Sequence, residues 1–333
     1  MNTLSTEMIR DPTTLASLVS DWWARWHRTP QATPFQSPAW LMAWWNTFEP
    51  GQLCSIAIRS GPRLVALAPL YLDGVRLLPL GIGTSDYCDL LIDPAFERVS
   101  AGAVMAAIMG ITAWNVCEFP ELTADASFFK LPAPAALKTM LLQANAAPVL
   151  DLPGRLEDLA EKIPRFRLRQ IRRARKAAAK RGDVAVVVGD LQNSNALFQD
   201  LIRLHTARWN QRGKTGVFFD ERAVAFHATA LPALITAKVA RLYGLTIGNS
   251  IVAVYYGFVD RGRAYAYLKG YDPAFAKQSP GLLVLAHAIE EAVREGAKEF
   301  HFLRGDEAYK YEWGASRRCN SFTKFVRETV LAS

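Results

Sequence analysis

A dense group of polar and aromatic residues follows an apolar segment near the carboxyl end of the chain. Residues 300–305 read Phe-His-Phe-Leu-Arg-Gly, which predicts a strand that ends at Gly305. Polar side chains at strand ends in α/β proteins frequently line a site. We prefer that interpretation to a solvated turn held by salt bridges. The side chains here that can donate, accept or exchange protons are Arg304, Asp306, Glu307, Tyr309 and Lys310.

A second candidate begins with the strand predicted for residues 263–269. Regular alternation places Tyr265, Tyr267 and Lys269 on one face of that strand. A loop and a helix start follow, where Ser279 suits the cap position. Backbone N–H groups and the positive helix end there suit a pyrophosphate, although an ordinary helix start is the alternative. The candidate donor-binding residues are Tyr265, Tyr267, Lys269, Lys277, Gln278, Ser279 and Gly281.

A third candidate is His205, which lies on the helix predicted for residues 193–210. Its position falls on an apolar stripe, where a histidine is more often a core residue than a base. A catalytic base must also lie within reach of the proton it takes. Arg208 and Trp209 follow on the same helix and are candidates for substrate binding.

The fourth feature is a basic helix predicted for residues 165–181, which carry nine Lys and Arg and no acidic residue. Without these nine, the 39 Lys and Arg residues of the chain are reduced to 30, against 31 Asp and Glu residues. The net charge of +8 therefore arises from this one segment. A protein that binds nucleic acid nonspecifically would instead carry positive charge over much of its surface. Like charges three or four residues apart on a helix repel one another. Acidic groups of another part of the chain, a phosphorylated ligand, tRNA or anionic lipid would offset this repulsion. The ordinary alternative is a helix face that is simply solvated.

An internal similarity indicates how these segments are arranged. Residues 56–67 and 243–254 each read as a β-hairpin with a glycine at the turn, and each is followed by Asp-Pro-Ala-Phe, a helix and a strand. We therefore predict a duplicated α/β unit, with an amino-terminal lobe at residues 1–150 and a carboxyl-terminal lobe at residues 155–333. The proline-containing stretch at residues 123–154 is predicted to connect the lobes.

Composition favours a folded protein, because 50% of the 333 residues are hydrophobic and 21% are charged. The four cysteines are far apart, which indicates neither a metal site nor a disulfide framework and favours a cytoplasmic location. The amino terminus does not resemble a signal peptide. The uncharged residues 99–117 lack leucine, so we predict a buried helix and a strand there rather than a membrane span.

Several stretches together resemble a known family. The chain resembles GNAT-superfamily acyltransferases of the CelD, or cellulose-biosynthesis, type, which are relatives of the Fem-type peptidoglycan aminoacyltransferases. The resemblance implies an α/β (α+β) fold of tandem GNAT-like lobes, each a mixed, mostly antiparallel sheet flanked by helices. The matching stretches are residues 34–40, residues 64–70, Ser85-Asp86-Tyr87, the basic helix ending in Gly182, residues 204–209, residues 279–281 and residues 303–313.

The resemblance implies an N-acyltransferase that moves an acyl group from acyl-CoA, or from an acyl carrier protein, onto an amine. The acceptor would be an amino sugar, an amino acid or a lipid amine. No metal is expected. The family's glycine pattern at the phosphate loop is reduced here to Gly281. The candidate substrate-binding residues are Asp86, Tyr87, Arg208, Trp209, Arg304 and Glu307.

We expect direct attack in a ternary complex, with the donor's pantetheine arm added as a strand beside residues 265–269. Asp306 or His205 would take the amine proton, Tyr309 would protonate the departing thiolate, and Lys310 would stabilise charge or orient the acceptor. A Fem-like transferase that uses aminoacyl-tRNA and a non-catalytic binding module are the alternatives. Peripheral contact of the basic helix with an anionic membrane, at the inner membrane of the cell, is a further expectation, and tRNA is a less favoured partner.

Overall fold

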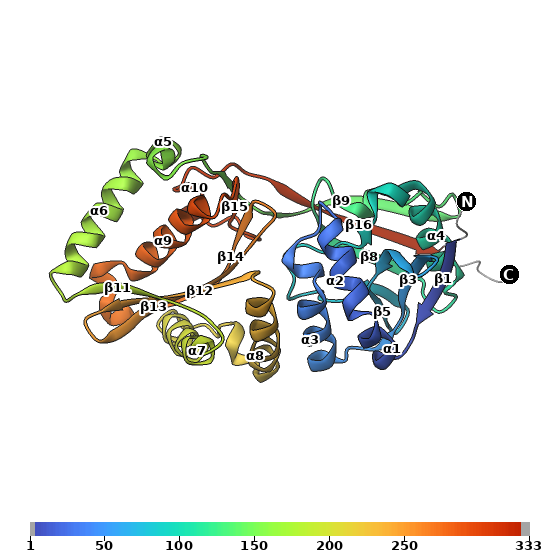
Figure 1. Ribbon diagram of the computed structural model, residues 1–333, viewed down its shortest axis with the longest axis horizontal. Helices are drawn as coiled ribbons and strands as arrows, with labels where there is room; N and C mark the ends of the chain where they lie inside the picture. The colour runs from blue at the N-terminus through green and yellow to red at the C-terminus, as the bar shows by residue number, and fades with distance from the viewer. Residues whose placement is uncertain (1–3, 328–333) are drawn as a thin grey trace. The chain divides into compact units, whose positions relative to one another are not determined.

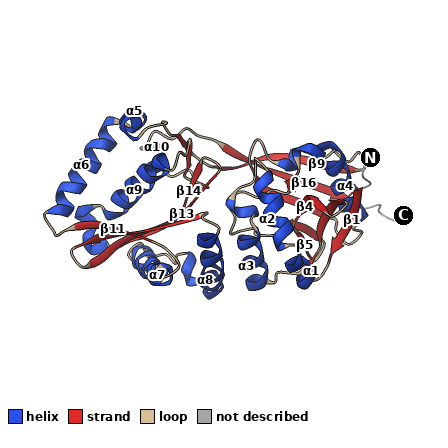
Figure 2. Cartoon of the chain, in the orientation of Figure 1, coloured by secondary structure: helices blue, strands red, loops and turns tan. Residues whose placement is uncertain are grey.

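The computed structural model describes residues 4–327, and the chain forms two compact units. The first comprises Met1–Asn145 together with Cys319–Ser333, and the second comprises Ala146–Arg318. Each unit has its own hydrophobic core. Both units combine β-sheet with flanking helices (Figure 2), so the expected α/β class is confirmed.

The first unit contains two sheets, with strand orders β1-β3-β4-β7 and β2-β5-β6-β8-β16-β9. Helix α4 packs on the four-stranded sheet, because Val104 and Ile108 bury an apolar face in the core. No helix within residues 4–327 is long and apolar enough to cross a membrane. The elements are β1 (Leu4–Ile9), α1 (Pro12–Ser17), α2 (Val19–Arg28), α3 (Pro38–Phe48), β2 (Gln52–Leu53), β3 (Ser55–Ser60), β4 (Arg63–Ala68), β5 (Leu70–Asp73), β6 (Arg76–Pro79), β7 (Leu91–Ile92), α4 (Glu97–Gly110), β8 (Val116–Leu122), β9 (Leu137–Ala146) and β16 (Cys319–Arg327).

The second unit is built on one six-stranded sheet, in the order β10-β15-β14-β13-β12-β11. Helices α6 and α9 cover one face of this sheet, and α7 and α8 cover the other (Figure 1). The predicted basic helix is confirmed as α6, which buries Ile171, Ala174 and Ala178 against α9. The elements are β10 (Val149–Asp151), α5 (Leu159–Lys162), α6 (Arg165–Ala179), β11 (Val184–Val188), α7 (Ser194–Asn210), α8 (Glu221–Thr236), β12 (Ala240–Ile247), β13 (Ser250–Asp260), β14 (Arg263–Tyr271), α9 (Pro280–Arg294), β15 (Glu299–His301) and α10 (Ala308–Tyr311).

The hairpins β3–β4 and β12–β13 match each other in detail. Each turns at a glycine in the left-handed region, Gly61 at φ 59° and Gly248 at φ 60°. Each also carries a register shift two residues before the strand end, after Ile58 in the first unit and after Leu245 in the second. A shared bulge at the same place is not dictated by hairpin formation alone, and it supports the predicted duplication.

The segment after each hairpin repeats as well. The third strand, β7 or β14, pairs antiparallel with the second strand of its hairpin and is followed directly by an aspartate. The Asp93 N–H donates to the carbonyl of Val65, and the Asp272 N–H donates to that of Val252, both at 2.8 Å. Each aspartate side chain then caps a short 3₁₀ turn that leads into α4 or α9. The two units therefore share a hairpin–strand–helix–strand order.

The last strand crosses back into the first unit. β16 pairs antiparallel with β8 and lies between β8 and β9 in the six-stranded sheet. The observed division thus differs from the expected one, which assigned all of residues 155–333 to the second lobe. The stretch at residues 123–154 is also more than a connector, because it contains β9 and β10.

Candidate active site

Strands β14 and β15 separate part of the way along the sheet of the second unit. They pair in parallel at three positions, of which the last joins Tyr265 to His301, where β15 ends. β14 continues to Tyr271, and beyond Tyr265 no described strand of this sheet pairs with that edge. Two neighbouring strands that diverge in this way open a wedge in the sheet at the start of α9.

A bulge in β14 determines which side chains face the wedge. Tyr256 pairs with Leu268, whereas the next residue of β13, Gly257, pairs with Ala266, so Tyr267 is an extra residue in the ladder. An extra residue reverses the alternation of side chains beyond it. The prediction that Tyr265, Tyr267 and Lys269 share one face is therefore wrong.

The two tyrosines pack away from the wedge. The Tyr265 ring lies 4.9 Å from the ring of His301, and the Tyr267 ring lies 5.5 Å from that of His227 on α8. Lys269 instead shares its face with Tyr271, toward α9. Of the three expected donor-binding residues on this strand, only Lys269 lines the pocket described next.

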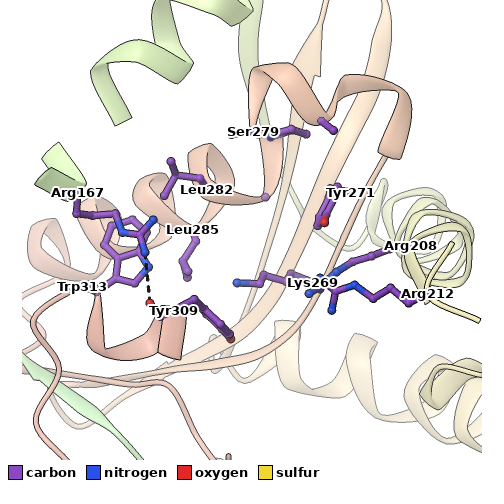
Figure 3. A pocket seen from close by; sticks show the side chains of 13 residues that line it. Arg167, Arg208, Arg212, Lys269, Tyr271, Ser279, Leu282, Leu285, Tyr309 and Trp313 are labelled. Atoms are coloured by element: carbon purple, nitrogen blue, oxygen red, sulfur yellow. Dashed lines mark hydrogen bonds between the residues drawn. The ribbon is translucent and has the colours of Figure 1, made fainter. Parts of the chain in front are cut away.

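The wedge opens into a pocket of about 310 Å³ (Figure 3). The Lys269 side chain extends into it, with Nζ lying 4.2 Å from the centroid of the Tyr309 ring. Four cationic side chains and no carboxylate line the pocket, which therefore suits an anionic ligand. The lining residues are Arg167, Arg208, Arg212, Lys269, Tyr271, Ala276, Ser279, Pro280, Gly281, Leu282, Leu285, Tyr309 and Trp313.

These cations influence one another. Burial, and then the nearby charges of Arg208, Lys310 and Arg167, lower the pKa of Lys269 to about 7. Arg167 forms an ion pair with Glu312 and lies over the Trp313 ring. Burial raises the pKa of the Tyr309 hydroxyl to about 12, so this group stays protonated at neutral pH.

The start of α9 differs from a simple capped helix. Ser279 occupies the cap position in the left-handed region, at φ 49°, and its side chain makes no capping hydrogen bond. Pro280 takes the first helical position. A Cβ on Gly281 would lie 2.8 Å from the Tyr271 ring, so glycine is needed for this ring to pack beside the helix. An adjoining groove is lined by Arg173 and Lys277, whereas Gln278 lines neither the pocket nor this groove.

Lys310 does not face the pocket. Its buried ammonium group donates to the carbonyl oxygens of Leu303, Arg304 and Gly305 at 3.0, 2.6 and 3.1 Å. It also forms an ion pair with Glu307 at 2.9 Å. All three donors of an ammonium group are thus used, and the geometry assigns Lys310 to the support of this loop.

Of the other candidate residues between Arg304 and Tyr309, most also lie outside the pocket. Asp306 is exposed, where it accepts a hydrogen bond from the Tyr311 hydroxyl and pairs with Arg317. Neither Asp306 nor Lys310 lines the pocket at the start of α9, contrary to the expectation from the sequence. The half-buried Arg304 and the exposed Glu307 do not line it either, which leaves Tyr309 as the candidate of this segment that does.

His205 is a buried residue of α7. Its Nε2 accepts a hydrogen bond from the Trp209 indole at 2.9 Å, and Gly216 packs against its ring. Burial, and then the charge of Arg208, lower the pKa of His205 to about 4. His205 and Trp209 do not line the pocket, whereas Arg208 from the same helix does.

We expect His205 to make the protein sensitive to acid. Its pKa in the folded chain lies below the ordinary value of 6.5, so the unfolded chain binds more protons. Its contribution is fully present above about pH 6.5 and is lost as pH falls toward 4, by up to about 1.4 kcal/mol per pH unit. Urea unfolding at pH 7 and pH 5 should show a smaller loss in His205→Gln, which keeps an acceptor for Trp209. An equal loss in both proteins would contradict this assignment.

The two candidates in the first unit lie in its interior. Asp86 is buried, and its backbone carbonyl accepts from the Asn320 side chain at 3.4 Å. Tyr87 packs against Phe35, and its carbonyl accepts from Gln36 at 2.8 Å. Within residues 4–327, no group of three or more His, Cys, Asp or Glu side chains is placed to hold a metal ion.

Several pocket residues were not predicted as site residues. Arg167 was one of nine similar residues on α6, and only its burial beside Trp313 distinguishes it. Tyr271 immediately precedes the Asp-Pro-Ala-Phe repeat, which was a usable signal for this end of the strand. Arg212 and Leu285 carried no signal of their own.

Comparisons with known proteins agree with this geometry. Residues 165–311 match the model of the Acetyltransferase (GNAT) domain family. A search of curated proteins by sequence found no match. Residues 165–311 include both strands of the wedge, helix α9 and most of the residues that line the pocket.

Solved structures share the fold of the whole chain. FemX matches with a TM-score of 0.67 over 96% of both chains, at 11% identity. The C-terminal domain of a protein assigned as a lysylphosphatidylglycerol synthetase from Agrobacterium fabrum matches with a TM-score of 0.58, at 12% identity, over 94% of this chain and 92% of that one. A conserved protein of unknown function from Bacteroides thetaiotaomicron matches with a TM-score of 0.59, at 12% identity, over 96% and 100%. The whole chain thus shares the fold of these solved structures, and its second unit contains the part that matches the GNAT acetyltransferase domain.

Proposed function

We propose that the protein is an N-acyltransferase that moves an acyl group from acyl-CoA, or from an acyl carrier protein, onto an amine. The observation that carries the proposal is the wedge between β14 and β15, which opens into a carboxylate-free, cationic pocket at the start of α9. The match of residues 165–311 to a GNAT acetyltransferase domain gives independent support. The CelD-type assignment and the nature of the acceptor remain predictions.

The donor would bind along the open edge of β14. A pantetheine arm carries amide groups, which can pair with backbone beyond Tyr265 as an added strand does. The Gly281 N–H and the cations of the adjoining groove would bind the phosphates at the other end. This arrangement places the thioester deep in the wedge.

The chemistry then needs few groups. The neutral amine attacks the thioester carbonyl carbon, and the C–S bond breaks as the tetrahedral intermediate collapses. Lys269, whose pKa of about 7 leaves much of it unprotonated at neutral pH, accepts the proton of the amine. The Tyr309 hydroxyl supplies a proton to the departing thiolate. The expected base roles of Asp306 and His205 are not retained, because neither lines the pocket.

Donor binding tests the proposal directly. Acetyl-CoA at a hundred times its Kd should stabilise the protein by about 2.7 kcal/mol, because it binds only the folded state. Gly281→Ala should displace the Tyr271 ring and weaken donor binding about ten-fold, as measured by calorimetry. Thermal-shift screens with acetyl-CoA, a long-chain acyl-CoA and CoA identify the preferred donor.

The duplicated helix supplies the control. Gly102 lies on α4, the counterpart of α9, and a Cβ there meets no atom within 4 Å. Gly102→Ala should therefore leave donor affinity unchanged. The proposal fails if no acyl-CoA raises the melting temperature, or if both alanine variants bind the donor as the original chain does.

The role of α6 as a partner surface also stays a prediction. Most of its basic side chains are exposed, and two of them form ion pairs, Arg167 with Glu312 and Arg175 with Glu290. Arg167 lines the pocket and Arg173 lines the adjoining groove. Contact of the exposed face with an anionic membrane or with tRNA would use the remaining charges.

A further inference from the structure

Arg208 has an incomplete set of partners. It reaches the pocket from α7, and its guanidinium lies 5.1 Å from the Tyr271 ring centroid and 6.0 Å from that of Trp209. Its Nε is buried and has no hydrogen-bond partner in the part of the chain that the structure describes. Buried donors are nearly always hydrogen-bonded in folded proteins, and a guanidinium cannot lose its charge. A donor left in this state indicates a position for an external acceptor.

The surrounding charges point the same way. Arg167 has its own counter-ion in Glu312, but within residues 4–327 Arg208, Arg212 and Lys269 form no ion pair. Three cations that share a partly enclosed pocket repel one another, and Glu307 offsets only part of that repulsion on Lys269. The aromatic faces of Tyr271 and Trp209 hold the Arg208 guanidinium in place, so the group is positioned before a ligand arrives.

We propose that Arg208, with Arg212 and Lys269 beside it, forms an oxyanion subsite that binds a carboxylate or phosphate group of a substrate. The planar fork of an arginine matches such groups and can bind them through two parallel hydrogen bonds. The inference rests on the proposed function only for the question of which substrate carries the anion. An acceptor amine that also bears a carboxylate or phosphate would use this subsite.

Occupancy of the subsite should be linked to a proton. The groups that act on Lys269 are Arg208, Lys310 and Arg167, which disfavour its charged form, and Glu307, which favours it. An anion held by Arg208 offsets the largest of these repulsions, so it raises the pKa of Lys269 from about 7. Binding should therefore take up a fraction of a proton at pH 7, and affinity should fall as pH rises above 7.

Sulfate is the probe of choice, because it keeps the same charge across this pH range. Calorimetric titration at pH 7, in two buffers with different ionisation enthalpies, gives both the affinity and the proton uptake. We expect Arg208→Gln to weaken sulfate binding about ten- to a hundred-fold, since a charge-assisted hydrogen bond is lost. Lys269→Met should still bind sulfate, more weakly, but without proton uptake.

Arg222→Gln is the matched control. Arg222 lies on α8, is exposed and is paired with Asp220 at 3.1 Å, so its loss should leave sulfate binding unchanged. Circular dichroism confirms that each variant is folded, and Arg208→Lys, which keeps the charge without the fork, should bind with intermediate affinity. Sulfate binding by Arg208→Gln equal to that of the original chain overturns the proposal, as does proton uptake that persists in Lys269→Met.

A second arm identifies the source of the anion. If acetyl-CoA competes with sulfate while S-acetylpantetheine, which lacks phosphate, does not, a donor phosphate occupies the subsite and its assignment to the acceptor is overturned. If sulfate and acetyl-CoA bind together, the subsite belongs to the acceptor, which must then be an anionic amine. Sulfate binding that depends on Arg208, with no binding of acetyl-CoA, supports the subsite and contradicts the proposed function.

Discussion

A chain that ends at Arg318 should lack a native first unit. Such a chain has lost β16, which lies between β8 and β9, so both neighbours keep a row of unpaired backbone groups. It has also lost Phe325, which is buried in the core of that unit. Removal of one buried phenylalanine side chain costs about 3–5 kcal/mol, and loss of the whole strand exceeds the usual stability of a domain.

Tryptophan signals report on this unit, since six of the nine tryptophans lie in the first 45 residues. Near-ultraviolet circular dichroism of the shortened chain should lose most of its tryptophan bands. Phe325→Ala should lower the melting temperature without abolishing the fold. A chain that ends at Arg327 keeps β16 and should retain the bands, and retention of the bands by the chain ending at Arg318 would contradict the assignment.

Replacement of Lys310 by methionine should cost about 3 kcal/mol of stability, because three carbonyl groups of residues 303–305 lose their common charged donor. The loop that Lys310 supports includes Leu303 at φ 60°, a conformation that non-glycine residues seldom adopt. Urea unfolding measures the loss. Acetyl-CoA binding should weaken in proportion to the unfolded fraction.

Asp306→Asn provides the comparison for Lys310→Met. Asp306 is exposed and pairs with Arg317 at 3.2 Å, and such surface pairs contribute only about 0–1 kcal/mol. Its loss should change neither stability nor donor binding by a large factor. A Lys310→Met protein of unchanged stability that has lost turnover would restore the catalytic role expected from the sequence.

The repeated hairpins could be predicted because their signals are local. A glycine at each turn and a capping aspartate before each helix act within a few residues, so both copies are visible in the sequence. Helix α6 was equally clear. The bulge at Tyr267 could not be predicted in this way. The alternating tyrosines look the same in the sequence with or without a bulge, but the extra residue moves the side chains that follow it to the opposite face of the strand.

Non-local choices explain the other differences. The residues of β16 have a strand-like pattern, but a pattern does not state which sheet a strand will join. The function of Lys310 likewise depends on the loop at residues 303–305 turning back toward it, which spacing alone does not reveal. Arg208 was predicted to bind substrate from a motif, whereas its unsatisfied Nε required the structure.

The return of β16 to the first unit also bears on the order of events at the ribosome. Domains generally fold as units while the chain is made, with the amino-terminal one first. Here the first unit cannot complete its six-stranded sheet until Cys319–Arg327 has been translated, after all of the second unit. The nascent chain therefore carries an unfinished sheet edge through most of its synthesis, and the second unit can reach its native state before the first.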